Sequence, residues 1–331
     1  MPERFRDWAD SGLPPDSPGT VLTVGTFDGV HRGHQSVLGG IAERAEASGL
    51  DSVLVTFDPH PLEIVRADRA PRLLTVGIEK AEIVAASGIG YMAVLPFTRS
   101  LQWYTAAQFV DEILIKRFHM RELVIGFDHH FGRDREGSAE ILRALGASRG
   151  FRVDVVAPVR GGTAAPLSSS GIRRAIEQGD LGAAEAALGR AYSVSGAVRH
   201  GEQRGRLLGF PTINLTPPHP RKLLPPTGVY AVRVETPVGP FGGMMNLGPR
   251  PTFGDAEISL EVHLFDAAED LYGTSVKVAF AARLRDTVRF ATVEALVAQL
   301  NEDAAQARRA LTHPGEASNL HVSPRNPIPL P

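Results

Sequence analysis

The sequence contains no cysteine and no long uninterrupted apolar run. Without cysteine, the chain can form no disulfide, no thiolate metal site and no cysteine nucleophile, so any metal must be held by oxygen or nitrogen. No run approaches the roughly 18 consecutive apolar residues that a membrane-spanning helix needs. Residues 1–20 are charged and proline-rich, and they lack the apolar core of a signal peptide. We therefore expect a soluble cytoplasmic protein with no membrane partner.

An excess of charge of one sign is also missing. The 35 Lys and Arg residues nearly balance the 37 Asp and Glu residues, for a formal net charge of -2. This balance provides no global basic field to hold nucleic acid, and no stripe of basic residues alternates with aromatic ones. A small polyanionic ligand would need only a local positive site. The 331 residues, 43% of them hydrophobic, are enough for two domains.

The first part of the chain predicts an α/β fold. Between residues 20 and 157, helical patterns separate five apolar runs: TVLTVGTF, SVLVTFDP, YMAVLPFT, ELVIGFD and FRVDVVAP. Continuous apolar strands alternating with helices are typical of a parallel sheet covered on both faces. Ligands of such sheets bind beyond the carboxyl ends of the strands.

From Tyr192 the pattern changes to short alternating strands, such as GVYAVRVET and ISLEVHLF. Strands of this kind, separated by Gly, Pro and Asn turns, predict an antiparallel sheet or barrel. Residues 292–311 then predict a helix that packs on the barrel through one apolar stripe. We expect domains at 1–188 and 189–311, followed by a flexible tail at 312–331. The residues of the stripe are Val293, Leu296, Val297 and Leu300.

The stretch VLTVGTFDGVHRGH, residues 21–34, joins the first predicted strand to a helix. A helix that starts there directs its unpaired N–H groups at the end of the strand, where a phosphate fits. Gly25 and Gly33 let the backbone approach a ligand closely. His31 and His34 can donate to phosphoryl oxygens, which indicates attack on a nucleoside triphosphate with pyrophosphate leaving.

An isolated H-x-G-H is more often a helix cap or a surface feature than a site. Here it follows the first strand of an α/β sheet, which favours function. The spacing matches neither the P-loop nor G-x-G-x-x-G, so it does not indicate those two kinds of nucleotide site.

The second region contains HGEQRGRLLGFPTINL, residues 200–215. Its glycines, Gly205 among them, permit close backbone approach, while Thr212 and Asn214 offer two hard oxygen ligands on one face of a strand. Mg²⁺ takes few protein oxygens and completes its shell with water and phosphate, so this pair is sufficient beside ATP. Taken alone, P-T-x-N is usually a turn.

Strand alternation in ISLEVHLF separates Ile258, Leu260, Val262 and Leu264, which we expect to face the core, from Ser259, Glu261 and His263. Glu261 is then available as a general base toward a substrate hydroxyl. The alternative is a glutamate on the solvated face of a strand.

The whole pattern resembles a known family. H-x-G-H after the first strand is similar to the nucleotidylyltransferase superfamily, and GTFDGVHRGH resembles the flavin adenylyltransferase half of the bifunctional riboflavin kinase/FAD synthetase family. TFDPHP, GFDHHFGRDREG and LSSSGIR follow in the order that family shows. GFPTIN, GVYAV, MNLGPRPTF and EVHLFDAAEDLYG resemble its riboflavin kinase half. The resemblance implies a Rossmann-like nucleotidylyltransferase domain followed by the barrel.

The resemblance also implies two reactions: riboflavin phosphorylation to FMN by the barrel domain, and FMN adenylylation to FAD, with release of pyrophosphate, by the α/β domain. ATP is the co-substrate, and Mg²⁺ is expected in both halves. The implied catalytic residues are Glu261, His31 and His34. The implied ATP-binding residues are Gly25, Phe27, His31, Gly33, His34, Ser169, Arg173, Gly205 and Thr212. The implied flavin-binding residues are Asp58, Asp128, Phe210, Asn246 and Arg285, and the metal ligands are Thr212 and Asn214.

Three departures from the family pattern are visible. His129 replaces a usual phenylalanine, Ser170 and Gly171 replace a threonine and a larger residue, and Thr287 replaces an acidic residue. They leave open an enzyme with only one working half. A non-catalytic flavin- or nucleotide-binding regulator is the second alternative, although a pure binder would not need a base at Glu261. The sequence leaves open whether copies of the chain form a homo-oligomer.

Overall fold

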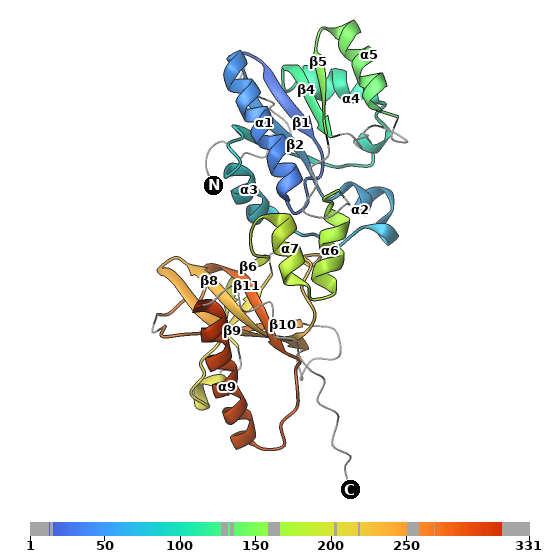
Figure 1. The fold of residues 1–331 in the computed structure, drawn as a ribbon. Coiled ribbons are helices and arrows are strands. Elements are labelled where there is room, and N and C mark those ends of the chain that lie inside the picture. The colour runs from blue at the N-terminus through green and yellow to red at the C-terminus, as the bar shows by residue number, and fades with distance from the viewer. Residues whose placement is uncertain are drawn as a thin grey trace. The chain divides into compact units, whose positions relative to one another are not determined.

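The structure is a computed structural model that describes residues 13, 16–126, 132, 136–157, 166–201, 204–217, 219–249, 258–267 and 269–312. The chain divides into two compact units that meet between Gly171 and Ile172. Each unit is treated by itself below (Figure 1). The predicted Asp128 and His129 lie outside the described residues, and so does the predicted tail apart from Thr312.

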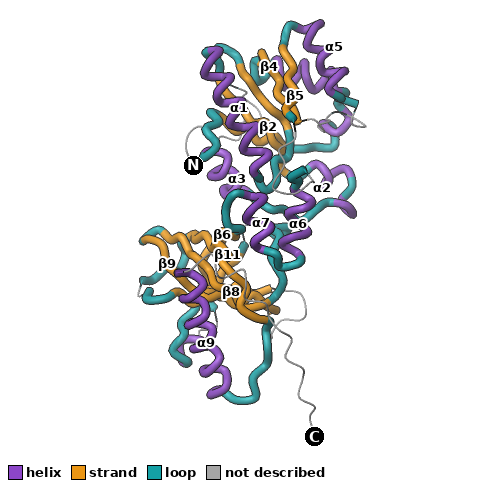
Figure 2. The backbone as a smooth tube through the Cα atoms, in the orientation of Figure 1, coloured by secondary structure: helices purple, strands orange, loops and turns teal. Residues whose placement is uncertain are grey.

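A five-stranded parallel sheet forms the centre of the first unit, with strand order β3-β2-β1-β4-β5. Each strand coincides with one of the five apolar runs, so the predicted α/β fold is confirmed (Figure 2). The strands are β1 (Thr20–Val24), β2 (Asp51–Asp58), β3 (Tyr91–Pro96), β4 (Met120–Gly126) and β5 (Arg152–Val156).

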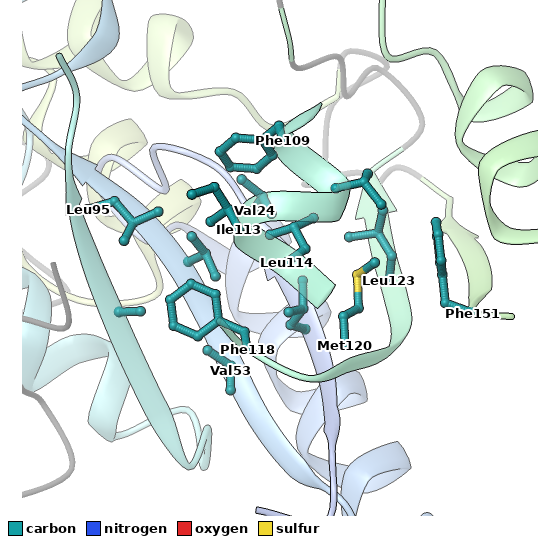
Figure 3. Close-up of a cluster of buried hydrophobic side chains, with 14 of the residues drawn as sticks. Val24, Val53, Leu95, Phe109, Ile113, Leu114, Phe118, Met120, Leu123 and Phe151 are labelled. Atoms are coloured by element: carbon teal, nitrogen blue, oxygen red, sulfur yellow. The ribbon is translucent and has the colours of Figure 1, made fainter. Parts of the chain in front are cut away.

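Both faces of this sheet are buried. Successive side chains of a strand point to opposite faces, so each strand contributes residues to two hydrophobic clusters. In β1, Leu22 and Val24 pack on one face, while Val21 packs on the other. The first cluster (Figure 3) includes Phe109 and Leu114 from the helical segment after β3. The second lies under α1 and α3. The helices and helical turns of this part are α1 (Arg32–Ser48), α2 (Pro61–Val65), η1 (Ala67–Arg69), α3 (Gly77–Ala85), η2 (Leu101–Trp103), α4 (Ala106–Phe109), the π-helix η3 (Val110–Ile115) and α5 (Ala139–Arg149).

The second unit contains a closed antiparallel barrel with strand order β10-β7-β6-β11-β8-β9, as the alternating pattern predicts. The strands are β6 (Ser193–Arg199), β7 (Ile213–Thr216), β8 (Gly228–Thr236), β9 (Gly239–Pro249), β10 (Ile258–Leu264) and β11 (Ser275–Arg285). The short α8 (Arg204–Leu207) precedes β7.

The terminal helix α9 (Val293–Thr312) begins where predicted, since Thr292 accepts a hydrogen bond from the amide of Ala295 at 3.2 Å. Its packing is shifted from the predicted stripe. Ala304, Ala307 and Ala310 bury against the barrel, with Leu300 partly buried beside them. Val293 is 57% exposed, because the first turns of α9 extend past the barrel wall (Figure 1).

The segment between sheet and barrel holds α6 (Ser169–Glu177) and α7 (Leu181–Leu188), and the side chain of Asp180 caps α7. From Ile172 onward this segment clusters with the barrel, so the predicted boundary at residues 188 and 189 stays a prediction. Ile258 opens β10 at 45% exposure, whereas Leu260, Val262 and Leu264 are buried as predicted. In the described part of the chain, no helix is both long and apolar enough to cross a membrane.

Candidate functional site

The loop between β1 and α1 has a strained backbone. Phe27, Gly29 and Val30 all have positive φ, at 43°, 82° and 38°. Glycine adopts such angles freely, but a β-branched valine does so only under constraint, at a cost of about 1–3 kcal/mol. Val30 is fully buried, and burial holds it in place. The loop is therefore a fixed shape at the carboxyl end of the central strand, where ligands of such sheets bind.

The two histidines of this loop lie against each other at the start of α1. His31 is the N-cap, and its Nδ1 accepts from the amide of His34 at 3.3 Å. A neutral His31 therefore carries its proton on Nε2. The two rings stack with centroids 3.7 Å apart, and the ring of Phe27 packs against His34 with its centroid 4.6 Å from that of the imidazole. The predicted pair and Phe27 are thus brought together.

Electrostatics keep His34 neutral. Burial lowers the pKa of His34 well below its usual value, and positive charge on His31 and Lys80 lowers it further. Its Nδ1 is buried without a hydrogen-bond partner among the described residues. A buried polar atom without a partner is costly, so this nitrogen is suited to meet a ligand.

Asp28, which the sequence reasoning missed, anchors the loop. Its buried carboxylate accepts from the amides of Leu74 at 2.9 Å and Thr75 at 3.0 Å. The hydroxyl of Thr75 in turn accepts from the amide of Gly29 at 3.0 Å. Ser169, predicted at the ATP site, donates to the backbone oxygen of Asp28 at 2.8 Å. Segments far apart in sequence thus fix the loop from two sides.

Lys80 was missed as well. It belongs to α3, and its Nζ donates to the backbone oxygen of Thr26 at 2.8 Å. The hydroxyl of Thr56 on β2 donates to the same oxygen at 3.2 Å. The sequence carried no signal for this contact, because a lysine 54 positions away on a helix reads as a surface residue. The loop between β1 and α1 contains no lysine, and the fold brings Lys80 of α3 into contact with it.

In the barrel, strand register aligns three predicted residues. Glu261 on β10 pairs with Asn214 on β7 on one side and with Asn246 on β9 on the other. Directly paired residues point to the same face of a sheet, so the three side chains lie abreast. Met244, two residues before Asn246, belongs to the cluster under α9, which places this row on the outer face of the barrel beside that helix.

The row is held by close neighbours. Ser259 is buried and donates to Oε1 of Glu261 at 2.8 Å. Asn214 is buried, and any side chain at Gly201 would overlap its amide group. A side chain at Gly205 would overlap the backbone oxygen of Phe210. Both positions require glycine because other parts of the chain approach them closely. The role of Gly205 toward ATP stays a prediction.

A pocket of about 460 Å³ opens next to Thr212. Its wall includes Arg206 before β7, Val262 and Leu264 on β10, and Tyr272 after it. Tyr272 also stacks on His200 with ring centroids 3.7 Å apart. The pocket combines apolar walls with a cation and a flat aromatic ring, which is the composition that small-molecule sites share.

Comparison with known proteins identifies the family. A family model for FAD synthetase matches residues 13–170, and one for riboflavin kinase matches residues 188–311. The bifunctional riboflavin kinase/FMN adenylyltransferase of Escherichia coli (strain K12) is 38% identical over 300 residues, covering 89% of this chain and 95% of that protein. The protein of the same description from Pseudomonas fluorescens is 40% identical over 297 residues, covering 89% and 94%. The chain belongs to the bifunctional riboflavin kinase/FMN adenylyltransferase family.

Membership confirms the predicted family and its two activities, riboflavin kinase and FMN adenylyltransferase. Such an enzyme uses ATP, with riboflavin, FMN and FAD as substrates and products. A solved structure described as a macrolide-efflux protein from Streptococcus pneumoniae is also similar. It has a TM-score of 0.79 and 31% sequence identity, and the match covers 92% of this chain and 99% of that one.

Arg285, predicted at the flavin site of this bifunctional family, is engaged elsewhere in the structure. Its Nε and Nη2 bind the two oxygens of Asp303 on α9 at 2.8 and 2.6 Å, and its Nη1 donates to the backbone oxygen of Asp286 at 2.8 Å. Asp303 is fully buried and also accepts from Gln299 at 2.9 Å. Arg285 therefore ties β11 to α9. A role toward flavin stays a prediction.

The structure gives the following places for the remaining predicted residues of this bifunctional enzyme. Gly25 hydrogen-bonds to Val55 at the ends of β1 and β2, and Gly33 lies in the first turn of α1. Asp58 is exposed at the end of β2, and Phe210 packs partly under α9. Arg173 lies in α6, in the second compact unit. Their roles toward ATP and flavin stay predictions.

Proposed function

We propose that the α/β unit carries the adenylyl transfer and the barrel carries the phosphoryl transfer, each through the residues described above. The observation that carries the first half is the His31–His34 pair, stacked at the N-terminus of α1 with a buried nitrogen that lacks a partner among the described residues. The observation that carries the second is the row of Asn214, Glu261 and Asn246 on one barrel face.

In the adenylyl half, a phosphate oxygen of FMN attacks the α-phosphorus of ATP, and the bond to the β-phosphate breaks as pyrophosphate leaves. Negative charge grows on the leaving oxygens, so donors held in place before the reaction favour the transition state. The N-terminus of α1 supplies backbone N–H groups there. His31 and His34 supply ring N–H groups, and the fixed loop keeps them from rearranging.

In the kinase half, Glu261 accepts the proton of the ribityl 5′-hydroxyl as that oxygen attacks the γ-phosphorus of ATP, and ADP leaves. Ser259 holds the carboxylate through Oε1, which orients the other oxygen for the substrate. Phosphoryl transfer needs mainly positioning and charge neutralisation. The row of paired residues provides the positioning, because its members are fixed by backbone register rather than by flexible loops.

Mg²⁺ belongs to this proposal. No group of three or more His, Asp or Glu side chains in the described part of the chain could hold a metal ion, so no all-protein cage is present there. A hydroxyl and an amide oxygen from Thr212 and Asn214 fit an ion whose other ligands are ATP phosphates and water. When bound, Mg²⁺ would neutralise phosphate charge. The backbone of Gly201 lies close to the side-chain amide of Asn214, where a larger residue would displace it.

Ligand contacts complete the proposal. ATP in the α/β unit would meet Gly25, Phe27, Gly33 and Ser169, and ATP in the barrel would meet Gly205 and Thr212. Arg173, which the resemblance also assigns to ATP, belongs to the second compact unit, and its role stays a prediction. The flavin contacts we propose are Asp58 and Asp128 for FMN in the α/β unit, and Phe210, Asn246 and Arg285 in the barrel. We also place the protein in the cytoplasm.

The test uses the full chain with riboflavin, ATP and Mg²⁺, with flavins separated by chromatography. Wild type should form FMN and then FAD. Glu261→Ala should stop FMN formation while FAD still forms from supplied FMN. His31→Ala with His34→Ala should do the reverse.

If the wild type forms FMN but no FAD, only the kinase half is active. If it forms neither product, a non-catalytic binding protein is favoured. If either substitution abolished both steps equally, the division of labour between the units would be wrong.

A further inference from the structure

Lys80 reaches the loop of the adenylyl site from outside it. The ammonium lies at the end of a side chain on α3 and donates to the backbone oxygen of Thr26 at 2.8 Å, with the hydroxyl of Thr56 3.5 Å away. Thr26 is followed directly by Phe27, which covers His34. An ammonium has three N–H groups. Two have these partners, and the third has none among the residues that the structure describes.

The charges around Lys80 are those of the same site. Burial lowers the pKa of Lys80, while Asp28 and Asp58 oppose that decrease. Lys80 in turn lowers the pKa of His34. The groups facing Lys80 thus come from the loop, from the end of β2 and from α1. The partly buried ammonium offsets part of the negative charge of these two carboxylates, and it lies near a neutral imidazole.

We propose that Lys80 is a third donor of the adenylyl site: it holds the Thr26 carbonyl and the Thr56 hydroxyl with two N–H groups and directs the third at the triphosphate of ATP. This inference rests on the proposed adenylyl transfer by the α/β unit. The chemistry of that step is unchanged. The FMN oxygen forms a bond to the α-phosphorus, the bond to the β-phosphate breaks with its electron pair on pyrophosphate, and Lys80 stays protonated throughout.

The lysine does here what a phosphate-binding loop does with a lysine of its own, but from another element. His34 is neutral, so it donates a hydrogen bond without a full charge. A triphosphate and the departing pyrophosphate carry several negative charges, and a partly buried ammonium opposes them more strongly than a neutral imidazole N–H can. The constrained loop and the lysine then have distinct tasks. The loop positions the phosphates of ATP, and Lys80 supplies positive charge beside them.

The experiment compares Lys80→Met, which keeps the length and apolar stem, with Lys80→Arg, which keeps the charge. Lys116→Met is the matched control, because the side chain of Lys116 is 71% exposed and pairs with Glu112 on the surface. All variants are made in the full chain. The measured quantities are kcat and KM for FAD formation from FMN, the affinity for pyrophosphate in the reverse reaction, riboflavin kinase activity and thermal stability.

Lys80→Met should lower kcat/KM for ATP in FAD formation about 100-fold. It should also lower the affinity for pyrophosphate in the reverse reaction. The KM for FMN and the riboflavin kinase rate should not change. Lys80→Arg should recover most of the rate. At alkaline pH the wild type should lose activity as Lys80 gives up its proton, and the arginine variant should hold its activity to higher pH.

Failure of the wild type to form FAD would overturn the proposed function itself. If the wild type forms FAD and Lys80→Met matches it in rate and pH profile, only the lysine inference fails. An equal loss in the Met and Arg variants, with lowered thermal stability, would also overturn it, because the residue would then be merely structural.

Discussion

The ring of His31 lies flat on the ring of His34, with centroids 3.7 Å apart and planes 15° apart. Burial lowers the pKa of His34, and charge on the adjacent His31 lowers it further. One turn of helix thus brings the two rings together and keeps His34 neutral.

The lowered pKa of His34 predicts a pH effect with a definite sign. In the unfolded chain His34 takes up a proton near pH 6.5, whereas in the folded protein it does so only at lower pH. Between those values the unfolded state binds more protons, so stability falls as pH decreases through this window and is fully present above it. Adenylyl transfer that depends on neutral His34 should persist below pH 6.5.

An NMR titration of labelled His34 in the folded protein, compared with the same protein in urea, checks this shift. The Lys80→Met variant should move the titration of His34 to higher pH, because one repelling charge is removed. A titration of folded His34 at the value found in urea would contradict the neutral assignment.

Substitution of Asp28 by Asn should disable the adenylyl half. The carboxylate accepts from the amides of Leu74 and Thr75, and an amide group offers only one oxygen in place of two. Hydrogen bonds to a charged acceptor are each worth about 1.5–3 kcal/mol. We expect FAD formation to fall at least 10-fold, with riboflavin kinase activity retained, in the two flavin assays. Glu43→Gln on the outer part of α1 serves as the control, and an unchanged rate in Asp28→Asn would exclude the anchoring role.

Gly201→Ala should disable the kinase half. The added methyl group would overlap the side-chain amide of Asn214, so the asparagine must leave its place beside Glu261. Gly40→Ala is the matched control, because the same methyl group meets nothing within 4 Å there. FMN formation should be lost in the first variant and kept in the second, while FAD formation from FMN survives in both. Wild-type kinase activity in Gly201→Ala would mean that the position of Asn214 is unimportant.

Arg285→Met should destabilise the barrel unit by about 3–5 kcal/mol, because it leaves the buried carboxylate of Asp303 without its cation. Denaturant unfolding measures the loss. Combining Arg285→Met with Asp303→Leu should restore most of the stability, since neither charge then remains buried.

The double variant also separates the two roles of Arg285. If its stability and kinase rate both return, Arg285 is an anchor of α9. A stable double variant with a raised KM for riboflavin would support the predicted flavin contact instead.

Much of the fold could be predicted because its signals are local. The five strands of the sheet are short apolar runs, and burial on both faces demands such runs. His31 and His34 lie in one continuous stretch, so a single turn from strand to helix is enough to bring them together. Alternation along β10 places Glu261 opposite Leu260 and Val262, whatever its neighbours are. The stripe on α9 was shifted because helix periodicity shows a face but not how far the barrel wall extends.

The sequence by itself determined the order of the elements, the histidine pair and the strand face on which Glu261 lies. These features depend on helix and strand periodicity and on turn residues, which act over a few positions. Tertiary structure alone decided that Asp28 is held by Leu74 and Thr75, that Lys80 reaches Thr26, and that Arg285 faces Asp303. These contacts join residues 18 to 54 positions apart. No local pattern encodes them, because a polar side chain on a helix looks the same in sequence whether it meets water or a buried partner.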